Sequence, residues 1–207
     1  MVRPRQVSDE QVLEAALAIF MEHGPKAPVS KIADRLGVSD AAIFKRFGTK
    51  EDLLLAAVMP PEEPPFLALL EAGPRPSDVH EQLVEIAASI TRVLDGMIPR
   101  LTLLQAAGVG HRRAFQRYDV PPPVRALRAL ASWIAAAQSD GRIADHVSPD
   151  TTAMMIMGSV QFRTFLFGVV GAAMSPDCVE HLPDAADYGR EVIDSLWAGI
   201  APTGEAS

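Results

Sequence analysis

The strongest constraint on the fold of this chain is the segment from Pro28 to Leu53, in which two short apolar patterns are separated by a glycine. Gly37 can adopt the positive φ that a tight turn between two helices requires, and the apolar residues on either side follow helical spacing. Ser39 can cap the second helix through its hydroxyl, and Ala33 is small where two helices must approach closely. The segment therefore predicts a helix-turn-helix.

Helix signals continue along the chain, whereas strand signals are weak. Ser8 and Gln11 have the spacing of a capping box, and Thr49 can cap a helix that starts at Lys50. Pro99 is expected to kink or break a long helix that starts near residue 77. The chain is thus expected to be all-α, with about nine helices and two domains, over residues 1–55 and 56–207. The expected helices cover residues 8–23, 28–36, 40–47, 50–58, a possible short one at 66–72, one from 77 toward Pro99, and then 97–107, 121–141, 149–173 and 183–200. Residues 108–120 are expected to form a loop or short turn.

The net charge of −7 hides an uneven distribution. Residues 1–50 hold 8 basic and 6 acidic side chains, whereas the remainder holds 11 basic and 20 acidic ones. All four lysines lie at or before Lys50. The average charge argues against a nucleic-acid partner, but the mildly basic N-terminal part permits one.

Several classes of protein are disfavoured by what the sequence contains. The single cysteine, Cys178, excludes a disulfide framework within one chain, and no signal-peptide pattern opens the sequence. The apolar stretch from Ala153 to Met174 carries Arg163 at its centre, where a bilayer would penalise the charge. A buried helix in a cytoplasmic protein is preferred. The five histidines lack metal-ligand spacing and no nucleophile or phosphate-loop motif occurs, so no catalytic residue, metal or cofactor is expected.

The helix-turn-helix segment continues in a more specific pattern. It has two aromatic residues three positions apart and then Lys-Glu-x-Leu. In this order the sequence resembles the signature of the TetR family of bacterial transcriptional regulators, through Ile32, Ala33, Gly37, Val38, Ser39, Phe44, Phe47, Lys50, Glu51 and Leu53. The resemblance covers the N-terminal part; the remainder is similar only in helix count, length and its Leu-Trp-x-Gly-Ile ending.

The resemblance implies that the third helix binds in the major groove of double-stranded DNA. There Ala41 and Ala42 can touch a thymine methyl group, and Lys45 can donate to guanine. Lys50, with backbone N–H groups at a helix N-terminus, can hold a phosphate. Phe44 stands where the family commonly has a tyrosine, so it lacks a hydroxyl for a phosphate. The alternative is that the cationic side chains form a solvated face. The predicted DNA contacts are Ser39, Asp40, Ala41, Ala42, Phe44, Lys45, Arg46 and Lys50.

A second predicted site is a pocket for a small effector in the helical domain. Its candidate residues combine apolar breadth with one amide and one indole N–H, which suits a neutral, largely apolar or aromatic ligand. The alternative is that these residues pack the core. The candidates are Met97, Leu101, Gln105, Phe115, Trp133, Phe162 and Phe165.

The last two long helices carry more apolar surface than one chain can bury, so they are expected to form a homodimer. Members of the similar family usually pair through such helices, and a two-fold dimer matches a palindromic operator. The predicted interface residues are Gly158, Ser159, Val192, Leu196 and Trp197.

The function expected from these features is DNA-binding regulation, in the form of a repressor released from its operator by a small, largely apolar effector. Two alternatives remain at this point. One is an enzyme, which a pair of ionisable groups with perturbed pKa values in a cleft would favour. The other is an architectural or partner-binding protein without an effector, which a filled core would favour.

Overall fold

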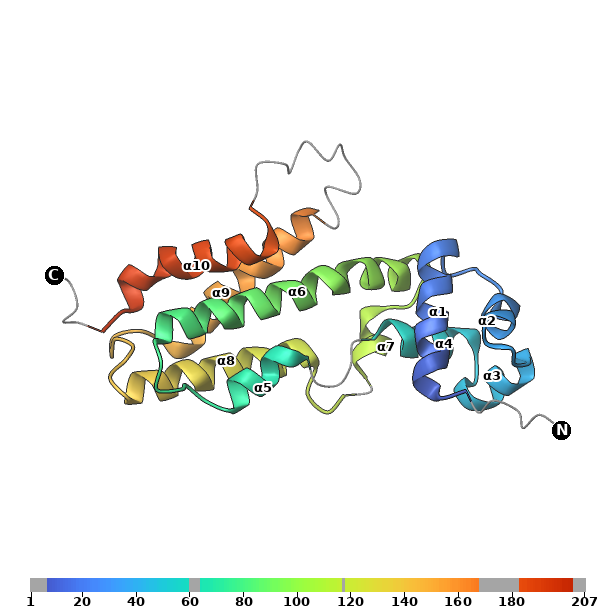
Figure 1. Cartoon of the computed structure of the whole chain (residues 1–207), viewed down its shortest axis with the longest axis horizontal. Helices are drawn as coiled ribbons and strands as arrows, with labels where there is room; N and C mark the ends of the chain where they lie inside the picture. The colour runs from blue at the N-terminus through green and yellow to red at the C-terminus, as the bar shows by residue number, and fades with distance from the viewer. Residues whose placement is uncertain (1–6, 60–63, 117, 168–182, 203–207) are drawn as a thin grey trace. The chain divides into compact units, whose positions relative to one another are not determined.

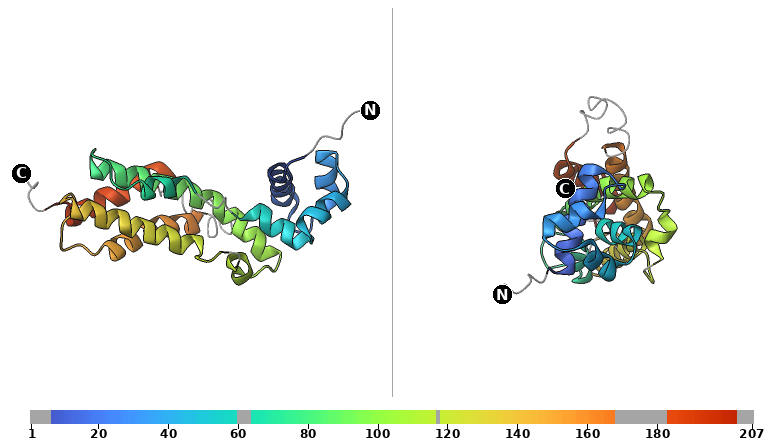
Figure 2. Two further views of the ribbon diagram at one scale, coloured as in Figure 1. Left: turned by 90° about the horizontal axis from the view of Figure 1, so that it is seen from below. Right: turned by 90° about the vertical axis from the view of Figure 1, so that its right-hand side faces the viewer.

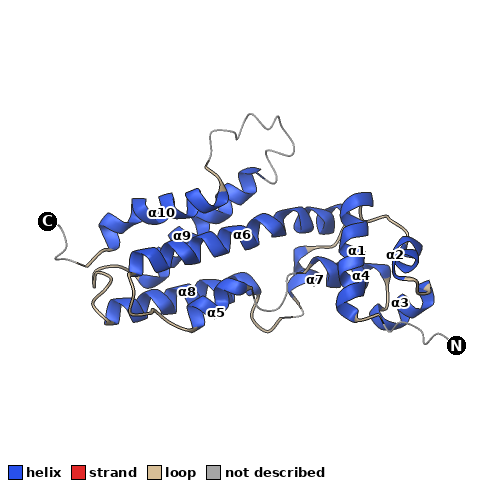
Figure 3. Ribbon diagram, in the orientation of Figure 1, coloured by secondary structure: helices blue, strands red, loops and turns tan. Residues whose placement is uncertain are grey.

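The computed structural model describes residues 7–59, 64–116, 118–167 and 183–202. Within these residues the chain is all-α, with ten helices and no strand (Figures 1 and 3). This confirms the all-helical fold expected from the sequence. The helices are α1 (Asp9–His23), α2 (Val29–Leu36), α3 (Asp40–Phe47), α4 (Lys50–Val58), α5 (Pro65–Glu71), α6 (Val79–Ala106), α7 (His111–Phe115), α8 (Pro122–Ser139), α9 (Pro149–Phe165) and α10 (Ala185–Ile200).

The chain divides into two compact units. The first unit contains Met1–Pro60 and Pro99–Arg117, and the second contains Pro61–Ile98 and Tyr118–Ser207. Helix α6 contributes to both units, because the division falls within it. The predicted functional boundary after residue 55 stays a prediction.

The helices of the first unit begin where side chains can cap them. The Ser8 hydroxyl accepts from the Gln11 N–H at 3.2 Å, and the Gln11 side chain accepts from the Ser8 N–H at 3.0 Å. Helix α1 packs on α2 and α4, and α3 packs on both α2 and α4. Their inward faces form a small core whose fully buried members include Phe20, Ile32, Ile43 and Leu53.

The second unit is built from long helices that run lengthwise beside one another (Figures 1 and 2). Helix α8 packs on α5 and α9, and α9 packs on α10. Trp133, Leu130 and Ile134 of α8 lie in the centre of its core, with Ile156 of α9. Gly189 lets α10 approach α6 closely, since a Cβ at this position would lie 3.0 Å from the backbone nitrogen of Ala88.

Two sequence-based expectations about the middle of the chain are wrong. Helix α6 continues through Pro99 as one helix of 28 residues, where a kink or break and a separate helix over 97–107 were expected. A proline removes one backbone hydrogen bond, and the helix retains the others on both sides. Second, residues 108–120, expected as a loop or short turn, contain the helix α7.

The apolar stretch near the C-terminus forms α9 only as far as Phe165. The predicted continuation over residues 168–173 lies outside the described residues. In the part of the chain that the structure describes, no helix combines the length and the apolar character that a membrane span needs.

Candidate DNA-binding surface

The turn between α2 and α3 has the geometry that a helix-turn-helix requires. Gly37 adopts the left-handed conformation, with φ 68° and ψ 34°, and the Val38 N–H donates a hydrogen bond to the carbonyl oxygen of Ala33 at 3.1 Å. Ser39 then starts α3, since its hydroxyl accepts from the Ala42 N–H at 3.2 Å. The direction of α3 is therefore set by groups that lie within a few residues of the turn.

Helix α3 presents one face to the core and another to solvent. Ile43 is 1% exposed and holds the helix against α2 and α4. Ala41, Ala42 and Lys45 are exposed, and Phe44 is 40% exposed. Two small side chains beside a lysine form an outer face that could approach base edges closely.

Arg46 differs from the other predicted DNA contacts because its guanidinium already has partners. It donates to the carbonyl oxygen of Val7 at 2.8 Å and pairs with the Asp9 carboxylate, and it lies 5.8 Å from the ring centroid of Phe47. These contacts tie the start of α1 to the end of α3. Arg46 thus has a structural role that its charge alone did not reveal.

Thr49 and Asp52 form a reciprocal cap at the start of α4. The Thr49 hydroxyl accepts from the Asp52 N–H at 3.1 Å, and the Thr49 N–H donates to the Asp52 carboxylate at 3.1 Å. The hydrogen bonds from Thr49 lower the pKa of Asp52. This cap does not involve the backbone N–H groups of Lys50 and Glu51, which lie in the first turn of α4 and have no acceptor within the helix.

Lys50 is half-buried, and desolvation lowers the pKa of its ammonium group. Its position at the positive end of the α4 dipole disfavours its charge further. A phosphate at this place would offset both effects, because it would meet Lys50 and the N–H groups of the first turn together. The position predicted for a phosphate contact therefore has suitable local chemistry.

Arg113 of α7 links this turn to a distant part of the chain. Its guanidinium pairs with Glu51 and, at 3.1 Å, with Asp52. Sequence reasoning missed this contact, because the partners are 62 and 61 residues apart. The carboxylates of Glu51 and Asp52, which follow Lys50 in the sequence, are therefore paired with Arg113 of the same unit.

The seven predicted effector residues are divided between the two units. Trp133 is 2% exposed within the core of the second unit, whereas Phe162 and Phe165 are 61% and 44% exposed and stack at 6.3 Å. Met97 also belongs to the second unit. The other three belong to the first unit: Leu101, Gln105 and Phe115. A shared pocket for these residues stays a prediction.

The predicted interface residues lie on α9 and α10. Gly158 is exposed and Ser159 half-exposed, and both line an open hollow of about 550 Å³ on α9 with Met154 and Met155. On α10 the side chains are less accessible: Val192 is buried, and Leu196 and Trp197 are partly buried. The accessible apolar surface is therefore concentrated on α9.

A cluster that the sequence analysis did not identify lies inside the second unit. Arg163 is buried on α9 and donates to both carboxylate oxygens of Asp95 on α6, at 3.1 and 3.2 Å. Thr164 donates to the same carboxylate at 3.0 Å, and Arg163 also lies 4.5 Å from the ring centroid of Phe167. Among the described residues, no group of three or more His, Cys, Asp or Glu side chains could hold a metal ion.

Comparison with known proteins supports the interpretation of the N-terminal unit. Residues 12–57 match the family model described as bacterial regulatory proteins, tetR family. No curated protein sequence matches the chain.

Solved structures of low sequence identity share the fold along nearly the whole chain. A putative TetR-family transcriptional regulator from Mesorhizobium loti has a TM-score of 0.71 and 16% identity, covering 93% of this chain and 96% of that chain. SmeT, the repressor of the Stenotrophomonas maltophilia multidrug efflux pump SmeDEF, has a TM-score of 0.65 and 22% identity, covering 96% and 93%. A SmeT–triclosan complex has a TM-score of 0.62 and 20% identity, covering 94% and 92%.

Proposed function

We propose that the chain is a transcriptional regulator of the TetR family, whose model matches residues 12–57, that it represses genes by binding a palindromic operator as a homodimer, and that a small, largely apolar effector releases it. One observation carries the DNA-binding part of the proposal. Helix α3 is held by buried Ile43 and a capped turn, while its outer face offers small side chains next to Lys45. Such a face suits close approach to base edges.

DNA recognition would divide between α3 and the start of α4. Ala41 and Ala42 would touch thymine methyl groups, and Lys45 would donate to the acceptor atoms of guanine. Lys50 would bind a phosphate with the N–H groups of the first turn of α4, which fixes register without reading sequence. Ser39, Asp40 and Phe44 would lie along the same edge.

The homodimer would form through α9 with support from α10. Four large apolar side chains of α9 are 44–61% exposed: Met154, Met155, Phe162 and Phe165. Gly158 lies among them, and its missing side chain would allow two copies of α9 to approach closely. A two-fold pair could present two α3 helices about 34–36 Å apart, the spacing of successive major grooves.

Release by an effector requires that the ligand bind better to a conformation in which the two α3 helices no longer fit successive grooves. The candidate residues are mostly apolar, which favours an apolar ligand. Among proteins of the same fold, SmeT forms a complex with triclosan. Triclosan is therefore a reasonable first probe for the present chain.

The DNA-binding proposal is tested by selecting bound sequences from random duplex DNA and titrating the selected operator across salt concentrations. Lys50→Ala should weaken binding to all sequences and reduce the salt slope by about one unit, whereas Lys45→Ala should relax preference at one or two base pairs. Lys26→Ala is a matched control, because it removes an exposed lysine outside α3 and α4. If both α3–α4 variants bind like Lys26→Ala, the assignment is wrong.

The dimer and the effector need separate measurements. Sedimentation should show a dimer at micromolar concentration that Phe162→Asp converts to monomer, while Met21→Asp, an exposed methionine of α1, leaves it intact. A stable wild-type monomer would contradict the interface. Triclosan should lower the affinity for the operator, and Gln105→Leu should reduce this effect without changing operator affinity in the absence of triclosan.

A further inference from the structure

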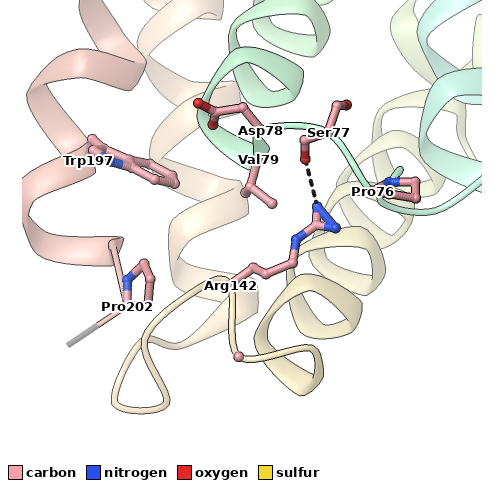
Figure 4. Close-up of a pocket in the computed structure, with 8 residues that line it drawn as sticks. Pro76, Ser77, Asp78, Val79, Arg142, Trp197 and Pro202 are labelled. Carbon is pink, nitrogen blue, oxygen red and sulfur yellow. Dashed lines mark hydrogen bonds between the residues drawn. The ribbon is translucent and has the colours of Figure 1, made fainter. Parts of the chain in front are cut away.

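The second unit contains a hollow at the beginning of α6 that shares only Trp197 with the predicted DNA, effector and interface residues. Its volume is about 370 Å³, and Figure 4 shows side chains from three segments around it. Residues 76–78 come from the segment before α6 and Val79 from its first position. Residues 141–142 come from the loop after α8, Trp197 from α10 and Pro202 from the residues after α10. Cavities that hold small ligands have volumes of roughly 300–1,000 Å³.

Arg142 brings a positive charge to this hollow. Its guanidinium donates to the carbonyl oxygens of Arg75 at 2.7 Å and Ser77 at 3.4 Å, so both partners are neutral. Within the described residues no carboxylate pairs with Arg142, whereas six other arginines have one: Arg46, Arg75, Arg113, Arg125, Arg163 and Arg190. A half-buried guanidinium with donors beyond these two bonds is suited to a carboxylate.

Trp197 brings a planar aromatic surface whose orientation is fixed by its neighbours. The His80 ring meets the indole edge-on, with centroids 5.0 Å apart and planes at 81°, and His80 is held by Asp194 at 2.7 Å. Asp78 adds a carboxylate, one oxygen of which accepts the His80 N–H at 2.8 Å. A cation, an aromatic plane and an anion therefore line one small space.

We propose that this hollow is a second ligand site, specific for a small aromatic carboxylic acid that carries an amino group. The ring packs against Trp197, the carboxylate meets Arg142, and the amino group faces Asp78. None of the predicted effector residues lines this hollow, and Met97 lies about 27 Å from Val79 along α6 at 1.5 Å per residue. A ligand here connects α6, α10 and the loop after α8, and stabilises the unit by binding its folded form.

The probe for this site is 4-aminobenzoate, and the readout is the indole N–H signals of the full-length protein in NMR spectra. The chain has two tryptophans, and Trp197→Phe identifies which signal belongs to Trp197. The probe should shift the Trp197 signal and leave that of the fully buried Trp133 in place. Arg142→Gln should weaken binding at least tenfold, whereas Arg128→Gln, which removes an exposed arginine of α8, should not change it.

Ligand analogues test the same assignment without altering the protein. Aniline, which lacks the carboxylate, should bind the wild-type chain at least tenfold more weakly than 4-aminobenzoate, and benzoate, which lacks the amino group, should bind a few times more weakly. The site is disproved if 4-aminobenzoate shifts neither tryptophan at millimolar concentration, if it shifts only Trp133, or if aniline binds as well as 4-aminobenzoate. Since these measurements use no DNA, they are independent of operator binding.

Discussion

The polar contacts inside the two units of this protein differ in how far apart the paired residues lie along the sequence. In the first unit, the caps at Ser8, Ser39 and Thr49 each join groups three residues apart. In the second unit, Asp95 pairs with Arg163 across 68 residues, and Glu81 pairs with Arg190 across 109. The helix starts of the first unit are thus specified by short windows of sequence, although Arg46–Asp9 and Arg113–Glu51 also join distant residues there. The pairs named in the second unit join distant helices.

This difference explains what each unit can tolerate. Removal of the cap from a short helix costs about 1 kcal/mol, because the effect is confined to the first orphan N–H groups. A buried ion pair between two long helices involves desolvated charge, so the loss of one partner leaves the other in an unfavourable environment. Substitutions at such pairs in the second unit should therefore lower the free energy of unfolding more than loss of a cap does. The loss should also depend on which of the two partners is replaced.

The largest effect is expected when the Asp95–Arg163 pair loses its carboxylate. The Arg163 side chain is 7% exposed and that of Asp95 is 36% exposed. Asp95→Ala would leave a buried guanidinium unpaired and should lower the free energy of unfolding by about 3 kcal/mol. Arg163→Met removes the buried charge while Asp95 remains reachable by water, so it should cost only about 1 kcal/mol.

Urea denaturation of both variants measures this asymmetry, with Asp145→Ala, an exposed carboxylate of the loop after α8, as the control. Equal losses for Asp95→Ala and Arg163→Met would show that the pair contributes through mutual attraction alone. If Asp145→Ala lowered the free energy of unfolding as much as Asp95→Ala, the effect of Asp95→Ala could not be attributed to the buried guanidinium of Arg163.

The next effect concerns the close approach of α10 to α6. A Cβ at Gly189 would lie 3.0–3.3 Å from backbone atoms of Ala87 and Ala88, which cannot rotate away. Gly189→Ala should therefore destabilise the chain by about 2 kcal/mol. Gly199, also in α10, has open space around it, and Gly199→Ala should stabilise the helix by roughly 0.5 kcal/mol. Thermal unfolding of the two variants would contradict this comparison if their midpoints moved in the same direction.

A smaller effect is expected in the first unit, at the cap of α4. Thr49→Ala removes the hydroxyl that accepts from the Asp52 N–H and should cost about 1 kcal/mol. Ser30→Ala changes an exposed hydroxyl residue of α2 that is not a cap and should have little effect. Urea titration followed by circular dichroism distinguishes them, and identical curves would mean that the cap does not stabilise α4.

The smallest effect is a dependence on pH at the exposed pair of Arg190 and Glu81, whose N–O distances are both 2.9 Å. Hydrogen bonds from Arg190 lower the pKa of Glu81 below its ordinary value of 4.5. A depressed carboxyl pKa stabilises the fold above that ordinary value, and the stabilisation is lost as the pH falls through the folded-state pKa. Arg190→Gln should therefore lower the Tm near neutral pH by no more than about 2 °C.

The Tm difference between Arg190→Gln and the wild-type chain should shrink as the pH falls below the ordinary pKa of Glu81, and disappear once the carboxyl group is protonated in both the folded and the unfolded state. Arg92→Gln serves as the control, because Arg92 is an exposed arginine of α6 that donates to the carbonyl oxygen of Ala88 and, among the described residues, pairs with no carboxylate. A difference for Arg190→Gln that persisted unchanged in acid would show that Glu81 is not the group responsible.

Much of the first unit could be predicted from the sequence. The capping box of Ser8, the turn at Gly37 and the start of α4 at Thr49 all occur where the sequence predicted them. Arg46 shows the limit, because its pairing with Asp9 depends on how α1 and α3 pack and not on any local pattern. The contact of Arg113 with Glu51 could not be predicted for the same reason.

In the second unit, the sequence predicted how many helices form, but it did not predict how these helices pack on one another. Apolar periodicity indicated which helices have a buried face, but it did not distinguish Trp133, which is in the core, from Phe162, which is exposed. Arg163 was visible as a charge within an apolar stretch, yet nothing in the sequence identified Asp95 as its partner. Helix α6 likewise continues through Pro99, where the sequence predicted that a separate helix would begin.

The sequence by itself thus determined where helices α1 to α4 begin and end, because capping and turn energies act between residues a few positions apart. The tertiary structure alone decided which cations are neutralised, which aromatic side chains are buried, and that Arg142, Trp197 and Asp78 line one hollow. Those outcomes depend on which helix faces meet. Burial and pairing energies act between surfaces brought together only by folding.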